Sequence, residues 1–179
     1  MQRRSVVFIV VILLAALLAG CFGGNKDKYI KSDNLALEKE YFASSFYRAE
    51  YDAPYAFDGD MRTRWSAAKD HAIDQFIGVD FGEEIEYNYV RIDQDQYPRI
   101  VKYVLQYSND GATYTDIPGT ETELTLETVK SVLSISFEPI RSQYLRLYIY
   151  ESIYADKGTT DPKEASINEF EVYLVTKQK

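Results

Sequence analysis

The chain has 179 residues, of which 46% are hydrophobic and 27% charged, and its formal net charge is −8. These values predict one globular domain with short extensions, and so acidic a chain argues against nucleic acid or anionic lipid as a partner. The single cysteine excludes an internal disulfide bond.

The first 20 residues have the layout of a secretory signal peptide. Two arginines are followed by an unbroken apolar run over residues 6–19, which is shorter than the ~20 residues that a membrane-spanning helix needs. The run leads into the sequence LAGC, which ends at Cys21 and resembles the bacterial lipobox. This resemblance implies cleavage before Cys21 and lipidation of that residue, so that the chain would contact a membrane through the lipid. A short uncleaved membrane anchor is the alternative.

Both alternatives place the remaining chain outside the cytoplasmic membrane. We expect it in the cell envelope and facing outward, on the outer membrane of a Gram-negative cell or on the outer face of the cytoplasmic membrane of a Gram-positive one. Residues 21–33 comprise the lipidated cysteine and a polar stretch with paired glycines, which predicts a flexible tether. Fully extended, such a dozen residues would reach about 40 Å.

From Asn34 onward, apolar residues recur mostly at every second position, which is typical of half-buried strands. The alternating positions are Ile77, Val79, Phe81, Val90, Ile92, Val101, Tyr103, Leu105, Leu145, Leu147, Ile149, Phe170, Val172 and Leu174. Turn signals separate these runs at residues 81–83, 108–111, 118–119 and 137–139. The acidic stretch 120–133 is predicted as two strands. This pattern predicts an all-β antiparallel sandwich without an internal domain boundary.

The order of several short motifs is more specific than the strands themselves. Asn34-Leu35-Ala36 and Ala43-Ser44-Ser45 are followed by AFDGDMRTRW, QFIGVDFG, YVLQYSNDGATY, FEPIRSQYLRLYI and INEFEVY. This succession resembles the coagulation factor V/VIII type C domain, also called the discoidin domain, whose bacterial branch includes carbohydrate-binding module family 32. The resemblance implies an eight-stranded antiparallel jelly-roll β-sandwich of the galactose-binding-like kind over residues 34–175, with residues 176–179 as a tail.

The motif AFDGDMRTRW, residues 56–65, combines two carboxylates, a glycine and a threonine. In many family members the matching segment wraps a calcium ion and the C-terminal strand closes the site. The resemblance implies carboxylates from Asp58 and Glu169, the hydroxyl and carbonyl of Thr63, and backbone carbonyls of Tyr55, Asp60 and Asn168. Ca²⁺ accepts six to eight oxygens of such mixed kinds, so a structural calcium ion is the expected cofactor. An ion-free Asp-Gly-Asp turn is the alternative. Trp65 is predicted as a core anchor.

Three polar loops can contribute ligand contacts, and the resemblance places sugar binding in loops at one end of the sandwich. They contain His71, then Tyr97 and Arg99, and finally Tyr154. A tyrosine offers a flat face to a sugar ring, and arginine can donate to two hydroxyls at once. For His71, the only histidine, a solvated surface position is the alternative.

The expected function is that of a surface-anchored lipoprotein that binds glycans without catalysing a reaction. A protein-binding adhesion or assembly module of the cell envelope, with an envelope protein complex as its partner, is the alternative. A glycoside-active enzyme is less favoured, because the chain has no H-E-x-x-H, no G-x-S-x-G and no phosphate-binding glycine loop. The many carboxylates leave an acid pair for glycoside cleavage open on composition alone.

Overall fold

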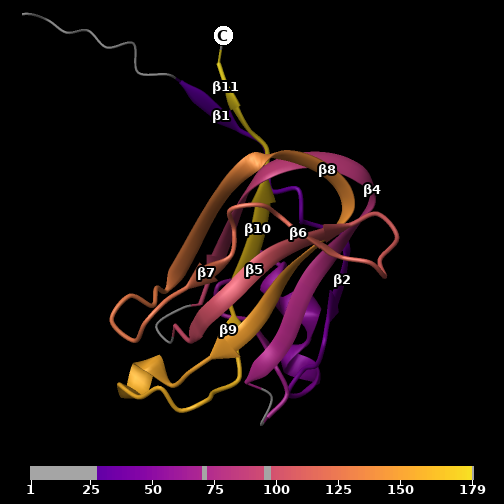
Figure 1. The fold of residues 1–179 in the computed structure, drawn as a ribbon. Helices are drawn as coiled ribbons and strands as arrows, with labels where there is room; N and C mark the ends of the chain where they lie inside the picture. The colour runs from indigo at the N-terminus through magenta and orange to yellow at the C-terminus, as the bar shows by residue number, and fades with distance from the viewer. Residues whose placement is uncertain (1–27, 70–71, 95–97, 179) are drawn as a thin grey trace, which may run out of the picture.

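The computed structural model describes residues 28–69, 72–94 and 98–178, and its regular structure is antiparallel β-strand apart from three short 3₁₀ helices (Figure 1). The strands are β1 (Tyr29–Lys31), β2 (Glu40–Ala43), β3 (Trp65–Ser66), β4 (Ile73–Asp93), β5 (Ile100–Ser108), β6 (Thr115–Asp116), β7 (Thr122–Glu123), β8 (Val132–Ser152), β9 (Ser166–Ile167), β10 (Glu169–Tyr173) and β11 (Val175–Lys177). The helices are η1 (Ala49–Tyr51), η2 (Ala53–Ala56) and η3 (Ala155–Lys157). The predicted all-β antiparallel fold is confirmed, although the described residues form eleven strands and not eight.

Two long strands, β4 and β8, run through both layers of the sandwich. Figure 1 shows both arching over one end of the molecule. Residues 73–80 of β4 pair with β2 and with the second half of β8, whereas residues 85–93 pair with β10 and with the first half of β8. Strand β5 lies on the other side of the second half of β8 and carries β6 and β7 on its free edge.

The turns predicted at residues 81–83 and 137–139 are bends within these continuous strands, so that part of the turn prediction was wrong. The β4–β8 register shifts between Asp80 and Ile85, and Gly82 there has a φ of 81°. A second shift lies between Tyr87 and Tyr89, next to the bend in β8. A bulge bends a strand and increases its twist without ending it, and glycine or proline marks a bulge as readily as a turn. The stretch 120–133 contains β7 and the start of β8, in agreement with the predicted two strands.

The core lies between the two layers. All the predicted alternating positions are buried except Leu174, which is half-buried. Trp65 is fully buried, and its indole N–H donates to the carbonyl of Ser45 at 2.9 Å. The tryptophan is therefore a core anchor, as its position after a tight loop predicted.

The two termini of the described chain meet at the arched end of the sandwich. Strand β1 pairs with β11, so residues 29–31 of the predicted tether and residues 176–177 of the predicted tail belong to the folded structure. Figure 1 shows β1 and β11 at one end of the molecule, and β9 with η3 at the opposite end. The signal peptide and Cys21 lie outside the described residues. Among the residues described, no helix is both long and apolar enough to cross a bilayer.

Candidate functional site

The loop from Asp58 to Thr63 curls back on itself. The Asp58 carboxylate accepts a hydrogen bond from the backbone N–H of Asp60 at 2.9 Å and one from the Thr63 hydroxyl at 2.8 Å. Gly59 sits at the tip with a φ of 75°, a conformation that favours glycine. The Asp60 side chain is instead paired with Arg62 at 2.6 Å, which lowers the pKa of Asp60 to about 2. Asp60 thus has only its carbonyl to offer to an ion.

The first residue of β10, Glu169, closes this loop from the other end of the chain. Its side chain is 3% exposed, and its Oε1 accepts from the backbone N–H of Gly59 at 3.3 Å. Its Oε2 is buried and has no hydrogen-bond partner among the described residues. Burial raises the pKa of the Glu169 carboxyl to about 7, and the nearby charge of Asp58 contributes further. An unpaired buried carboxylate oxygen beside a second carboxylate is an arrangement that a bound cation would stabilise.

The neighbouring residue Asn168 fastens the loop to the sandwich. Its side-chain amide donates to the carbonyls of Met61 at 3.0 Å and Thr63 at 3.2 Å. The structure thus brings Asp58 and Thr63 together with Asn168 and Glu169, which lie more than 100 residues later in the sequence. The sixth residue of the predicted ligand set, Tyr55, lies in η2, which leads into the loop.

The donor set of this loop fits calcium better than a transition metal. The described residues contain no cluster of three or more His, Cys, Asp and Glu side chains suited to a metal. An ion held by the loop would therefore depend on two carboxylates together with carbonyl and hydroxyl oxygens, which is the chemistry of Ca²⁺ sites. Calcium binding stays a prediction.

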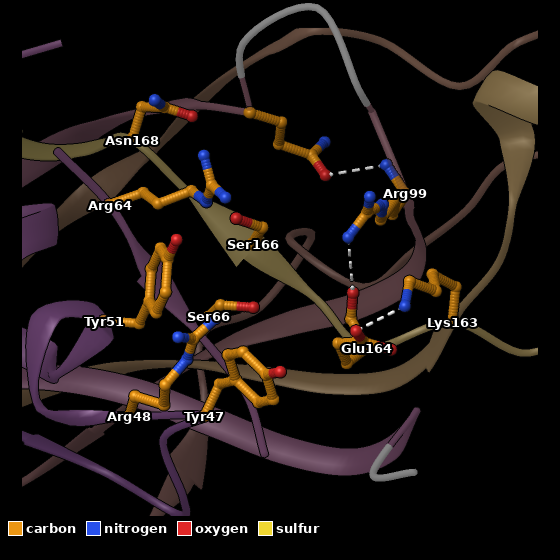
Figure 2. Close-up of a pocket in the computed structure, with 11 residues that line it drawn as sticks. Tyr47, Arg48, Tyr51, Arg64, Ser66, Arg99, Lys163, Glu164, Ser166 and Asn168 are labelled. Carbon is orange, nitrogen blue, oxygen red and sulfur yellow. Dashed lines mark hydrogen bonds and ion pairs between the residues drawn. The ribbon is translucent and has the colours of Figure 1, made fainter. Parts of the chain in front are cut away.

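A cavity of about 290 Å³ opens next to this loop, at the end of the molecule opposite the β1–β11 pair (Figures 1 and 2). Its lining residues are Tyr47, Arg48, Tyr51, Arg64, Ser66, Gln94, Arg99, Lys163, Glu164, Ser166 and Asn168. Two serines that face each other in the β3–β9 pair, Ser66 and Ser166, belong to this lining. We call this space the Ser66–Ser166 cavity.

One side of the Ser66–Ser166 cavity is aromatic. The rings of Tyr47 and Tyr51 lie with centroids 5.9 Å apart. The Arg48 guanidinium lies 4.6 Å from the Tyr47 ring, and the Arg64 guanidinium lies 4.9 Å from the Tyr51 ring. Helix η1 positions Tyr51, whereas Arg64 directly follows the Asp58–Thr63 loop.

The opposite side is polar and internally hydrogen-bonded. The buried Gln94 side chain accepts from the backbone N–H groups of Arg99 at 3.0 Å and Ile100 at 2.9 Å. The Arg99 guanidinium donates to the carbonyl of Glu164 at 3.3 Å, and Lys163 forms an ion pair with the Glu164 carboxylate. Figure 2 shows this group facing Arg64 and the two tyrosines across the cavity.

The structure places the four predicted ligand contacts differently. Arg99 lines the Ser66–Ser166 cavity. Tyr154 lines a neighbouring cavity, although its ring lies 5.9 Å from the Arg99 guanidinium. His71 and Tyr97 lie outside the described residues.

Sequence reasoning missed the aromatic side of the cavity altogether. Tyr47, Arg48 and Tyr51 come from the segment FYRAEY, which ends four residues before the proposed calcium motif. The available signal was the occurrence of two tyrosines and an arginine within five consecutive residues, 47–51. Arg64 was within the motif, but its residue type alone does not show that its side chain faces a cavity.

The comparisons with known proteins agree with this fold. A family model for the F5/8 type C domain matches residues 41–170. Chitosan-binding module 1 from a chitosanase/glucanase of Paenibacillus sp. IK-5 is 30% identical, with a TM-score of 0.63, over 79% of this chain and 99% of that chain. Module 2 from the same enzyme, solved in complex with chitotriose, is 25% identical, with a TM-score of 0.61, over 78% and 99%.

A more distant structure shows the same fold. The family 32 carbohydrate-binding module from C. perfringens NanJ, solved with galactose, is 20% identical, with a TM-score of 0.65, over 80% of this chain and 99% of that chain. The search of curated proteins gave no significant match. Because the family model spans more than half of the sequence, the chain belongs to the F5/8 type C (discoidin) domain family.

Proposed function

We propose that this chain is a surface-anchored, non-catalytic lipoprotein that binds carbohydrate in the Ser66–Ser166 cavity. The observation that carries the proposal is the cavity's composition, with two tyrosine rings on one side and hydrogen-bonding side chains around the rest. Sugar sites combine a flat apolar face with a few directed polar groups in this way. Two similar modules were solved with chitotriose and with galactose, which supports the same class of ligand here.

The position of the cavity suits a module held by its N-terminus. The cavity lies at the β3–β9 end, whereas β1 begins the described chain at the arched end (Figure 1). A lipid on Cys21 would therefore hold the arched end toward the membrane and leave the cavity facing outward. This orientation supports the proposed capture of glycans at the cell surface.

The carboxylates at the cavity argue for binding without hydrolysis. Glycosidases of the common mechanisms use two carboxyl groups, about 5–9.5 Å apart, on either side of the scissile bond. Glu164 is the single acidic residue in the described lining, and its carboxylate is paired with Lys163. Among the described residues, the lining therefore supplies no acid–base pair.

Calcium at the Asp58–Thr63 loop would have a structural role in this proposal. The ion would neutralise the carboxylates of Asp58 and Glu169 and hold the loop against β10. The predicted ligands Thr63 and Glu169 are adjacent in the chain to the cavity residues Arg64 and Asn168, respectively. An ion that holds the loop would therefore also hold this part of the cavity.

The test is calorimetric titration of the full chain, solubilised in a nonionic detergent, with a panel of oligosaccharides. We expect saturable binding, and a loss of at least tenfold in affinity for Tyr51→Ala, because stacked aromatic anchors are among the most costly interface residues to truncate. Tyr29→Ala removes an exposed tyrosine at the opposite end and is the matched control. Absence of binding across acidic, neutral and amino sugars, with the protein folded, would refute the proposal and favour an envelope protein as partner.

A further inference from the structure

The charge of the Ser66–Ser166 cavity is opposite to that of the chain. The whole chain carries a formal charge of −8. Among the described residues, in contrast, the cavity is lined by the four cations Arg48, Arg64, Arg99 and Lys163, and by one acid, Glu164. A concave site of one sign focuses its field, so this cavity attracts anions despite the acidic surface around it.

Three of these cations already have partners within the protein. Lys163 is paired with Glu164, and the Arg99 guanidinium donates to a backbone carbonyl. Arg48 pairs loosely with the exposed Glu50, at 3.5 Å. The Glu164 carboxylate neutralises one cation, and the exposed Glu50 offsets Arg48 only weakly. The cavity therefore keeps an excess of positive charge.

The fourth cation, Arg64, is the informative one. Its side chain makes no hydrogen bond or ion pair with any described residue, and its guanidinium lies 4.9 Å from the centre of the Tyr51 ring. The residue is half-buried, and Figure 2 shows its guanidinium directed toward Ser166 in the middle of the cavity. A guanidinium held partly out of water without an acid is poorly compensated, and its planar fork matches the two oxygens of a carboxylate or sulfate.

We infer that the Ser66–Ser166 cavity selects an anionic sugar unit, one that carries a carboxylate or a sulfate ester. This inference rests on the proposed glycan binding and names the class of glycan. The sugar ring lies against Tyr47 and Tyr51. Its anionic group accepts hydrogen bonds from the Arg64 guanidinium next to Ser66 and Ser166. A volume of about 290 Å³ lies at the small end of ligand pockets. The cavity therefore suits a short segment of a saccharide chain.

The same charges exclude the ligand class named for the similar modules from Paenibacillus sp. IK-5. Chitosan is a polymer of protonated amino sugars, and an amine placed between Arg64 and Arg99 meets like charges in a partly desolvated site. We therefore expect this chain to reject chitosan oligosaccharides although it shares 30% identity with a chitosan-binding module.

The experiment titrates the full chain in nonionic detergent with four oligosaccharides of matched length: oligogalacturonate, a sulfated galactan fragment, a neutral galactan fragment and chitosan. We expect the acidic ligands to bind at least tenfold more tightly than the neutral one, and chitosan not to bind. The first two ligands decide between carboxylate and sulfate. The affinity for the acidic ligand should also fall as salt is raised, because screening weakens the attraction.

Two variants with the same change in net charge separate the cavity from the surface. Arg64→Gln should weaken the acidic ligand about 10- to 100-fold, the size of a lost charge-assisted contact, and so remove most of its advantage over the neutral ligand. Arg141→Gln removes an exposed arginine on β8 that pairs opposite Glu86 and donates to the carbonyl of Glu84, and it should change the affinity for neither ligand. Glycan binding would stand but the anionic preference would be overturned if the acidic ligands bound no more tightly than the neutral galactan, or if Arg64→Gln left the affinity for the acidic ligands unchanged. Failure of all four ligands would overturn both.

Discussion

Removal of calcium should lower the melting temperature of the chain. An ion present at 100 times its dissociation constant stabilises the folded state by about 2.7 kcal/mol. In a folded unit of 150–250 residues, each kcal/mol shifts the melting temperature by about 2–4 °C. The expected difference between excess calcium and excess EGTA is therefore about 5–11 °C, measured by circular dichroism at a strand wavelength. Equal melting temperatures in the two buffers would refute the calcium site.

A variant of the closing carboxylate makes this test specific to the loop. Glu169→Gln removes one of two like charges that face each other, so in EGTA it should melt no lower than the unmodified chain. The same variant should lose most of the calcium-induced shift, because it no longer supplies an anionic ligand. Asp60→Asn is the matched control, because it keeps the backbone carbonyl and alters a side chain that contacts Arg62. A full calcium response in Glu169→Gln would show that the ion binds elsewhere.

Three further substitutions follow from the packing of the sandwich. Trp65→Ala should lower the free energy of unfolding by about 3–5 kcal/mol in a urea titration, because the indole is fully buried. Gly78→Ala should cost at least about 1–3 kcal/mol in the same assay, because the new Cβ would collide with the backbone carbonyl of Leu145 on the paired strand. Asn168→Ala should lower the free energy of unfolding by about 1–3 kcal/mol, because it leaves two loop carbonyls without their donor. The same variant should bind glycan more weakly in a titration. Unchanged binding would show that the loop does not position the cavity.

The long strands of the core could be predicted because each has a face of buried apolar residues. Leu145, Leu147 and Ile149 on β8 are fully buried and alternate with the half-buried residues Arg146 and Tyr148. The bends could not be predicted in the same way. Gly82 adopts a left-handed conformation in a bulge and would do so in a turn as well. Gly82 lies in a bulge and not in a turn because β4 pairs with β8 on both sides of the bend. That pairing joins residues far apart in the sequence, so it cannot be read from the residues around Gly82.

The resemblance to a family, and not the alternation, pointed to the contact between the Asp58–Thr63 loop and β10. Glu169 and Gly59 are 110 residues apart, and nothing local in either segment indicates that they meet. The cavity was harder still, because Tyr47 and Arg64 come from loops without periodicity. They share one cavity with Ser166 because β3 pairs with β9 across 100 residues, a register that the sequence of two-residue strands does not specify.

The Asp58–Thr63 loop and the segment 47–51 both border the cavity, but they have different expected roles. The loop fixes the backbone, and the segment 47–51 determines which ligand fits. Fixing Thr63 and Glu169 also fixes the backbone next to Arg64 and Asn168, which line the cavity. The segment 47–51 approaches the cavity from the other side and contacts Arg64 through an aromatic ring alone. Under the proposed function, substitutions in that segment should therefore change the preferred sugar without loosening the loop. In this chain the segment supplies an arginine and two tyrosines, and with Arg64 this combination suits a ring that carries negative charge.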